Sequence, residues 1–171
     1  MNPIKMVGIL SDSHDNMPAI RAAVELFNQR EVDLVIHAGD LVAPFTAREI
    51  KKLNCPYKIV LGNNDGEILG LFKIYDGNVY HPPFQLDVND KKILVLHDPI
   101  HLEILKQSQF FDLIIYGHDH NVAVTKSPNG CVIVNPGECS GWLTGRNTVA
   151  IWKVDTNEIE IVDLQINYPP H

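Results

Sequence analysis

The first half of the chain alternates short apolar runs with stretches whose apolar residues recur every three or four positions. Short apolar runs bounded by polar or turn residues predict buried strands, whereas the wider spacing predicts helices that cover them. Pro18 and Pro44 stand where two of these helices would begin, because proline suits the first helical turn. We therefore expect strands at 4–10, 34–36 and 57–61, and helices at about 18–27, 44–53 and 68–72.

Past Asn78 the pattern changes, because pairs of apolar runs now flank short turn sequences. Asn89-Asp90, Pro128-Asn129-Gly130 and Asp155-Thr156-Asn157 are combinations typical of turns between antiparallel strands. The second half is therefore expected to be largely antiparallel. We expect hairpins formed by 84–88 with 92–96, by 122–125 with 132–134 and by 148–154 with 158–164, together with a helix at 100–107 and a short buried strand at 113–116.

Both halves can be buried if two sheets pack face to face with helices on their outer sides. Strands that alternate with helices imply right-handed crossovers and a parallel sheet in the first half. The sequence shows no internal repeat, linker or low-complexity segment. We expect an α/β fold, a single domain over residues 1–166, and a frayed tail at 167–171.

The composition is that of an ordinary globular protein, and it bears on location. Of the 171 residues, 45% are apolar and 20% are charged, and no apolar run approaches the ~18 residues that a membrane span needs. The apolar start leads directly into Asp12 and is too short for a signal peptide. Cys55, Cys131 and Cys139 are far apart and are expected to be core residues in a reducing compartment. These features predict a cytoplasmic protein with no membrane partner.

The charge distribution disfavours nucleic acid as a partner. The formal net charge is −7, whereas proteins that bind duplexes usually carry a basic patch or stripe. The four arginines are scattered, and the only adjacent lysines are Lys51-Lys52 and Lys91-Lys92. Nothing in the sequence therefore predicts a basic patch, although folding could still bring separate cations together.

Seven side chains with metal-binding chemistry follow strand-like runs. In order along the chain they are Asp12, His14, Asp40, Asn63, His97, His118 and His120. In open α/β sheets ligands bind beyond the carboxyl ends of the strands, so several such loops can converge on one site. The set contains two pairs, Asp12 with His14 and His118 with His120, whose members are separated by one residue, and such residues share a face of an extended segment.

The mixture of imidazole, carboxylate and amide donors suits Mn²⁺, Ni²⁺, Fe²⁺, Co²⁺ or Zn²⁺ better than Ca²⁺ or Mg²⁺, and Mn²⁺ is the expected ion. Asp40 could bridge two cations, and Asn63 offers a neutral oxygen. Two divalent ions, Asp12, Asp40 and a bridging hydroxide would leave a net charge of about +1, which favours an anionic phosphate. Each motif alone also fits a capping turn or an ordinary loop. The ordered set predicts a dinuclear site for phosphoester hydrolysis.

The set Asp12-x-His14, Gly39-Asp40, Gly62-Asn63, His97 and Gly117-His118-x-His120 resembles the calcineurin-like metallophosphoesterase superfamily, and the short chain with Asn135-Pro136-Gly137 resembles its small prokaryotic phosphodiesterase branch. The resemblance spans about 4–164 and implies a four-layer α/β/β/α sandwich of two mixed sheets. It also implies that one metal is held by Asp12, His14 and His120, that the other is held by Asn63, His97 and His118, and that Asp40 bridges them. Asp40, Asn63 and His97 would then form the catalytic centre around a metal-bridging hydroxide that attacks phosphorus in line.

The sequence departs from this branch at two positions. Many relatives have a histidine, taken to protonate the leaving group, where this chain has Asn64, and an amide cannot act as a general acid. This favours substrates with good leaving groups or protonation by another group, of which His101 is a candidate. Asp98 replaces a common glycine, and could narrow the pocket or disfavour highly charged substrates.

Four further residues could support the site or merely pack. His37, within a predicted strand, is expected to be a structural histidine. Asp65 could accept a hydrogen bond from a ligand histidine, as carboxylates often do beside metals. Trp142 and Arg146 lie in a glycine-rich stretch and could line a substrate pocket or a subunit interface, although ordinary packing is the default.

The leading functional hypothesis is a metal-dependent phosphodiesterase that acts on small phosphodiesters and forms a homodimer or homotetramer. One alternative keeps the site and changes the substrate, giving a phosphomonoesterase or a nuclease; the acidic charge and the short chain weaken the nuclease. Another alternative is a protein-binding scaffold, because the superfamily includes a retromer scaffold subunit that looks degenerate at its metal positions. All seven ligands are present in this chain, so such decay is not evident.

Overall fold

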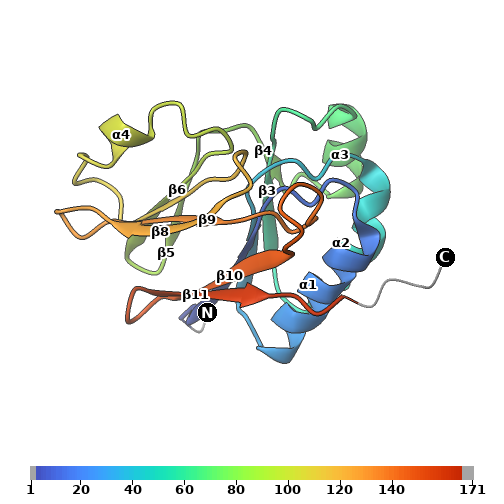
Figure 1. Ribbon diagram of the computed structural model, residues 1–171, viewed down its shortest axis with the longest axis horizontal. Coiled ribbons are helices and arrows are strands. Elements are labelled where there is room, and N and C mark those ends of the chain that lie inside the picture. Colours follow the sequence, from blue (N-terminus) through green and yellow to red (C-terminus); the bar gives the residue numbers. More distant parts are fainter. Residues whose placement is uncertain (1–2, 167–171) are drawn as a thin grey trace.

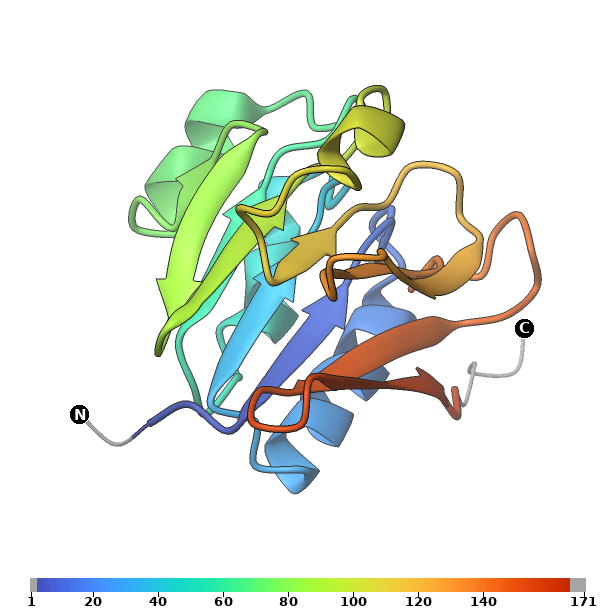
Figure 2. The same ribbon diagram turned by 90° about the vertical axis from the view of Figure 1, so that its left-hand side faces the viewer.

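Two β-sheets packed face to face form the centre of the fold (Figure 1). The computed structural model describes residues 3–166. One sheet has six strands in the order β11-β10-β1-β2-β3-β4. Its strands are β1 (Met6–Leu10), β2 (Leu34–His37), β3 (Tyr57–Val60), β4 (Val79–Tyr80), β10 (Thr148–Lys153) and β11 (Glu158–Asp163). The strands from β1 to β4 are parallel, whereas β10 pairs antiparallel with both β1 and β11. Figure 2 shows β1 and β2 running in the same direction.

The second sheet has five strands in the order β5-β6-β7-β9-β8. Its strands are β5 (Phe84–Val88), β6 (Lys91–Val95), β7 (Leu113–Ile115), β8 (Val122–Lys126) and β9 (Val132–Pro136). The outer pairs β5-β6 and β8-β9 are antiparallel hairpins, while β7 lies parallel to both β6 and β9. Both sheets are therefore mixed.

Helices cover the outer faces of the two sheets. The six-stranded sheet is covered by α1 (Met17–Gln29), the 3₁₀ turn η1 (Pro44–Thr46), α2 (Ala47–Ile50) and α3 (Ile68–Ile74), and the short α4 (Leu102–Leu105) lies on the opposite side of the molecule (Figure 1). The start of α1 follows from its sequence: Asn16 caps it by accepting a hydrogen bond from the N–H of Ala19, and Pro18 occupies its first turn. The longest helix has 13 residues, and in the described part of the chain none has the length and hydropathy that crossing a bilayer requires.

The main core lies between the sheets. Val7 and Ile36 from one sheet and Ile93 and Ile115 from the other have no exposed surface, and neither has Trp152. Two further clusters fill the space under the N-terminal helices, and a fourth lies under α4. Complete burial of one such aliphatic side chain stabilises a fold by about 1.5–3 kcal/mol. This central layer fixes the relative position of the two sheets, and with it the loops at their edges.

The predicted four-layer fold is confirmed, with three differences in detail. The second half is less antiparallel than expected, because a hairpin turn specifies only its own pair and not the neighbours of the lone strand β7. The two-residue strand β4 was not predicted. The helices expected at 44–53 and 100–107 are short: α2 ends at Ile50 and α4 covers only Leu102–Leu105. The single domain over 1–166 stays a prediction, and the expected tail lies outside the described residues.

Candidate metal centre

Loops from both sheets meet at one edge of the molecule and bring the seven predicted ligands together. The loops after β1, β2 and β3 carry Asp12, His14, Asp40 and Asn63, and the loops after β6 and β7 carry His97, His118 and His120. These strands are parallel within each sheet, so their carboxyl ends point to a common edge. The site therefore straddles the two sheets.

The ligand atoms fall into two overlapping groups. In the first, Nε2 of His14 and Nε2 of His120 lie 3.9 Å and 3.5 Å from Oδ1 of Asp12. The second consists of Asp12, Asp40 and His97, with Nε2 of His97 3.4 Å from Oδ2 of Asp40. The same oxygen of Asp40 lies 3.6 Å from Nε2 of His14. Asp40 therefore lies between the two groups, as a bridging ligand must.

Asn63 and His118 complete the second group. Oδ1 of Asn63 lies 2.9 Å from Nε2 of His97 and 2.9 Å from Nδ1 of His118. The amide oxygen and the two imidazoles thus converge on one point. All seven predicted ligands belong to one continuous cluster.

The polar atoms of this cluster fit divalent transition metals. Nε2 of His14 is buried and has no hydrogen-bond partner among residues 3–166. Asp12 has no exposed surface, and burial raises the pKa of its carboxyl, so an ionised Asp12 requires compensating positive charge. Burial also opposes ionisation of Asp40, but the neighbouring His97 and the hydrogen bonds donated by Asn64 keep the pKa of Asp40 below the usual range. Imidazole, carboxylate and amide oxygen form a donor set typical of such ions.

The backbone is unusual at the same residues. A positive φ in the left-handed region is uncommon for residues other than glycine, and such conformations gather at functional sites. Among the candidate ligands, φ is positive at Asp12 (51°), His14 (39°), Asp40 (59°), His118 (73°) and His120 (61°). The chain thus turns sharply after β1, β2 and β7 and points these side chains into the site.

Two glycines permit the loops to approach each other closely. Gly39 has a φ of 103°, and a Cβ placed there would overlap the ring of His97. A Cβ on Gly62 would overlap the carboxylate of Asp40. The glycine that precedes Asp40 and the glycine that precedes Asn63 are therefore required by contacts with other ligands.

Hydrogen bonds outside the cluster orient two of the histidines. Nδ1 of His97 donates to the carbonyl oxygen of Ala38 over 2.9 Å, and Nδ1 of His120 donates to Oε2 of Glu138 over 2.8 Å. Each bond fixes the tautomer that leaves Nε2 free to act as a ligand.

Glu138 was missed in the sequence analysis. It has no exposed surface, and it accepts hydrogen bonds from the N–H of Leu143, from the N–H and hydroxyl of Thr144 and from the hydroxyl of Ser140. Burial alone would raise the pKa of Glu138, but the hydrogen bonds from Thr144 and from His120 bring it down to about 2. One signal could have indicated it: an acidic residue directly follows Asn135-Pro136-Gly137 at the end of an apolar run.

His37 and Asp65 support the loops. His37 is buried, which lowers its pKa to about 3, and it is neutral: Nδ1 accepts from the N–H of Gly39, and Nε2 donates to the hydroxyl of Ser13. The prediction of a structural histidine is confirmed. Asp65 does not bond a ligand histidine. It accepts from the N–H groups of Asp40, Val42 and Gly62, and so ties the loop after β2 to the loop after β3.

Asn64 faces Asp40. Its backbone N–H donates to Oδ1 of Asp40 over 2.8 Å and its side-chain amide donates to Oδ2 over 2.7 Å. Asn64 therefore positions a candidate metal ligand in this chain. Trp142 lies beside the site and donates from Nε1 to the carbonyl oxygen of His14, whereas Arg146 pairs with Asp163 on β11.

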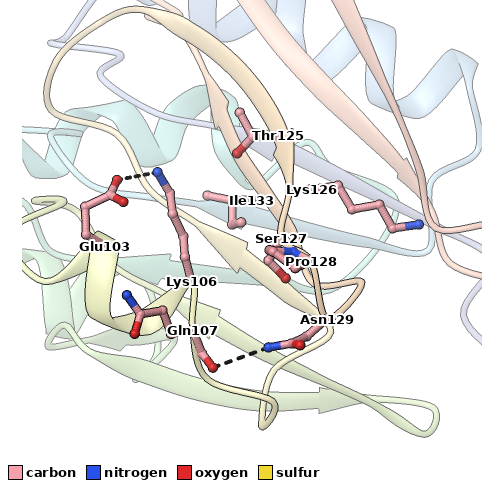
Figure 3. Close-up of a pocket in the computed structure, with 9 residues that line it drawn as sticks. All are labelled: Glu103, Lys106, Gln107, Thr125, Lys126, Ser127, Pro128, Asn129 and Ile133. Carbon is pink, nitrogen blue, oxygen red and sulfur yellow. Dashed lines mark hydrogen bonds and ion pairs between the residues drawn. The ribbon is translucent and has the colours of Figure 1, made fainter.

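Two cavities on the outer side of the five-stranded sheet differ in their relation to the ligands. One, of about 460 Å³, is lined by His97, Asp98 and His101 together with apolar residues. The other, of about 410 Å³, lies between the end of α4 and the β8–β9 turn (Figure 3). It contains none of the seven ligands, and Lys106 in its wall already pairs with Glu103. Only the first of these two cavities adjoins the candidate metal centre.

Comparisons with known proteins agree with this geometry. Residues 6–157 match the model of the calcineurin-like phosphoesterase superfamily domain. The chain is 36% identical over 165 residues to phosphodiesterase MJ0936 of Methanocaldococcus jannaschii, covering 93% of this chain and 99% of that protein. It is similar to the solved structure of an archaeal phosphodiesterase, with a TM-score of 0.86 at 34% identity over 93% of this chain and 99% of that one. Wild-type Vps29 of Entamoeba histolytica, complexed with Zn²⁺, shares the fold, with a TM-score of 0.63 at 18% identity over 94% and 99% of the two chains.

Proposed function

Because the chain belongs to the calcineurin-like phosphoesterase superfamily, we propose that it is a metal-dependent phosphodiesterase acting on small phosphodiesters. The observation that carries the proposal is the pair of overlapping ligand groups that share Asp12 and meet at Asp40. Phosphate esters are anionic. Divalent cations held by the imidazoles and carboxylates at this edge of the sheets would attract them.

In this proposal Asp12, His14 and His120 hold one ion, Asn63, His97 and His118 hold the other, and Asp40 bridges them. Two divalent ions, with Mn²⁺ the first choice and Ni²⁺, Fe²⁺, Co²⁺ or Zn²⁺ the alternatives, would activate water and neutralise charge on the phosphate during in-line displacement.

The protein's own groups keep these donors in place. Asn64 holds both oxygens of Asp40, so this carboxylate can lie between two ions without swinging away. Ala38 and Glu138 hold the rings of His97 and His120 by their Nδ1 atoms. Such prior orientation reduces the rearrangement needed when a charged substrate arrives.

Protonation of the leaving group falls to a group other than Asn64. His101 lines the same cavity as His97 and is exposed at the start of α4, and we keep it as the candidate donor. With a leaving group as acidic as p-nitrophenol, no donor is required, because the departing oxyanion is already stable.

Substitution of Asp40 tests the proposal. Protein stripped with a chelator is assayed on bis-p-nitrophenyl phosphate and p-nitrophenyl phosphate before and after Mn²⁺ is added. Wild-type protein should regain diesterase activity that exceeds its monoesterase activity, and Asp40→Ala should lose both the activity and part of the bound metal. Full activity in Asp40→Ala would refute the proposed site.

A phosphomonoesterase would reverse the order of the two activities, and a nuclease would prefer an oligonucleotide. The scaffold alternative has one favouring observation, the shared fold with Vps29. It would replace the enzyme if metal-loaded protein hydrolysed no phosphoester and instead retained a stable protein partner. A cytoplasmic location and a homodimer or homotetramer remain predictions from the sequence.

A further inference from the structure

We propose that the cavity beside His97 is the subsite for a neutral, ring-sized apolar group esterified to the substrate phosphate. This inference rests on the proposed function and specifies its substrate class: a phosphodiester with at least one aryl or similarly flat apolar ester group. The cavity has a volume of about 460 Å³, which lies within the usual range of small-molecule sites.

The walls of this cavity are mostly apolar. Their apolar residues include Pro82, Leu94, Leu96, Ile100, Leu105 and Phe111. Leu94 and Leu96 belong to the cluster on the outer face of the five-stranded sheet, and Phe111 packs against that cluster. An apolar ring entering this space would exchange contact with water for contact with these side chains.

One residue joins the cavity to the candidate metal centre. His97 lines the cavity, and its Nε2 lies 3.4 Å from Oδ2 of Asp40 and 2.9 Å from Oδ1 of Asn63. A phosphate bound at the centre therefore lies next to the wall of the cavity.

The free protein leaves an apolar side chain uncovered at this place. Ile100 is 70% exposed although it lines the cavity, and it follows Asp98 and Pro99 in the loop that leads to α4. A single exposed isoleucine is ordinary on a surface. Ile100, however, borders an apolar cavity beside the candidate metal ligands, so a ring bound in this cavity would cover its exposed side chain.

The charges of the residues that line this cavity determine which kind of ester group it can accept. Asp98 contributes the only carboxylate in the lining, and no lysine or arginine in the described part of the chain lines this cavity. A second phosphate would meet repulsion from Asp98 with no lysine or arginine to offset it, whereas a neutral ring would not. By contrast, the cavity in Figure 3 carries Lys106, Lys126 and Glu103 and borders no candidate ligand.

The test fills one cavity and, as a control, the other. Gln85 lines the cavity beside His97 from β5 and is exposed, and Gln107 lines the cavity of Figure 3 and is also exposed. Gln85→Trp and Gln107→Trp are thus the same substitution at two surface positions outside the candidate metal centre. Circular dichroism and the unfolding temperature verify that both variants fold.

Calorimetry on Mn²⁺-loaded protein then compares two probes that the enzyme cannot hydrolyse, phenylphosphonate and methylphosphonate. We expect wild-type protein and Gln107→Trp to bind phenylphosphonate about tenfold more tightly, since burial of a ring stabilises the complex in proportion to its apolar area. Gln85→Trp should bind both probes equally. An unchanged preference in Gln85→Trp, or no preference in the wild type, would overturn the subsite.

A probe without phosphorus separates this inference from the proposed function. Saturation-transfer NMR with phenol should give a signal for the wild type and Gln107→Trp and none for Gln85→Trp, because the neutral ring occupies the cavity without the metals. Equal signals from both variants would overturn the subsite even if the enzyme is active. If wild-type protein hydrolysed no phosphoester with any of the metals, the proposed function would be overturned. The NMR difference between the two variants would still show whether the ring binds in the cavity.

Discussion

Replacement of Glu138 by glutamine should weaken metal binding, although Glu138 is not a predicted ligand. In the wild type Oε2 of Glu138 accepts from Nδ1 of His120 over 2.8 Å, which leaves Nε2 of His120 free. The other carboxylate oxygen accepts from the backbone and hydroxyl of Thr144 and from the N–H of Leu143. These three donors would retain the amide oxygen of a glutamine, so its NH₂ group would face His120.

Two donors cannot share one hydrogen bond, so the ring of His120 must change its tautomer. Nδ1 would then accept from the amide and Nε2 would carry the proton, which prevents it from acting as a ligand. Loss of such a supporting carboxylate typically lowers metal affinity 10–100-fold, or about 1.4–2.7 kcal/mol of binding free energy. A histidine that keeps its original tautomer leaves a buried donor unsatisfied at a similar cost of about 1–3 kcal/mol.

The assay is competition with a coloured chelator, which yields the dissociation constant without any turnover. Glu103→Gln is the matched control, because the side chain of Glu103 is 84% exposed and, within residues 3–166, forms an ion pair with Lys106 alone. We expect the control to bind Mn²⁺ like the wild type. If Glu138→Gln binds Mn²⁺ as tightly as Glu103→Gln while both are folded, the reasoning about the His120 tautomer is refuted.

Three further outcomes are expected. Gly39→Ala should lower the unfolding temperature more than Gly77→Ala, because both glycines have a positive φ but only a Cβ at Gly39 meets His97; equal losses would show that the contact is unimportant. His101→Gln should slow hydrolysis of phosphodiesters with poor leaving groups at least tenfold and leave bis-p-nitrophenyl phosphate unaffected; equal rates for both substrate types would exclude His101 as the proton donor. Addition of Mn²⁺ at one hundred times its dissociation constant should stabilise the metal-stripped protein by about 2.7 kcal/mol, measured by thermal unfolding, with Asp40→Ala as the variant that should respond less.

The elements of the fold were predictable because apolar periodicity is a local signal. The apolar positions Ile20, Ala23, Val24 and Phe27 face the core from α1 as their spacing predicts. The neighbours of each strand in a sheet could not be predicted in this way, since nothing in the short run Leu113–Ile115 indicates whether it pairs in parallel or antiparallel. That choice depends on the long connections through α4 and around β8, which no local pattern encodes.

For the candidate site too, local features could be predicted from the sequence, whereas contacts between distant residues could not. Ligand types and their order are visible in the sequence, and the structure brings all seven together. Partners that are distant in sequence are not visible: Glu138 meets His120 from 18 residues away, and Asp65 bonds the backbone around Asp40 from 25 residues away. The cavity beside His97 was also hidden, because its walls come from β5, β6 and the loop around α4.

The left-handed backbone at five candidate ligands limits how this protein can be made more heat-resistant. A left-handed residue other than glycine costs about 1–2 kcal/mol, somewhat less for aspartate, and a whole domain is stable by only about 5–15 kcal/mol. Glycine would relax the chain at His118 or His120, but it would also delete the imidazole. Laboratory evolution that rewards heat resistance alone, in a medium without divalent ions, should therefore discard the site before it alters the core, and selection must reward metal-dependent hydrolysis at the same time.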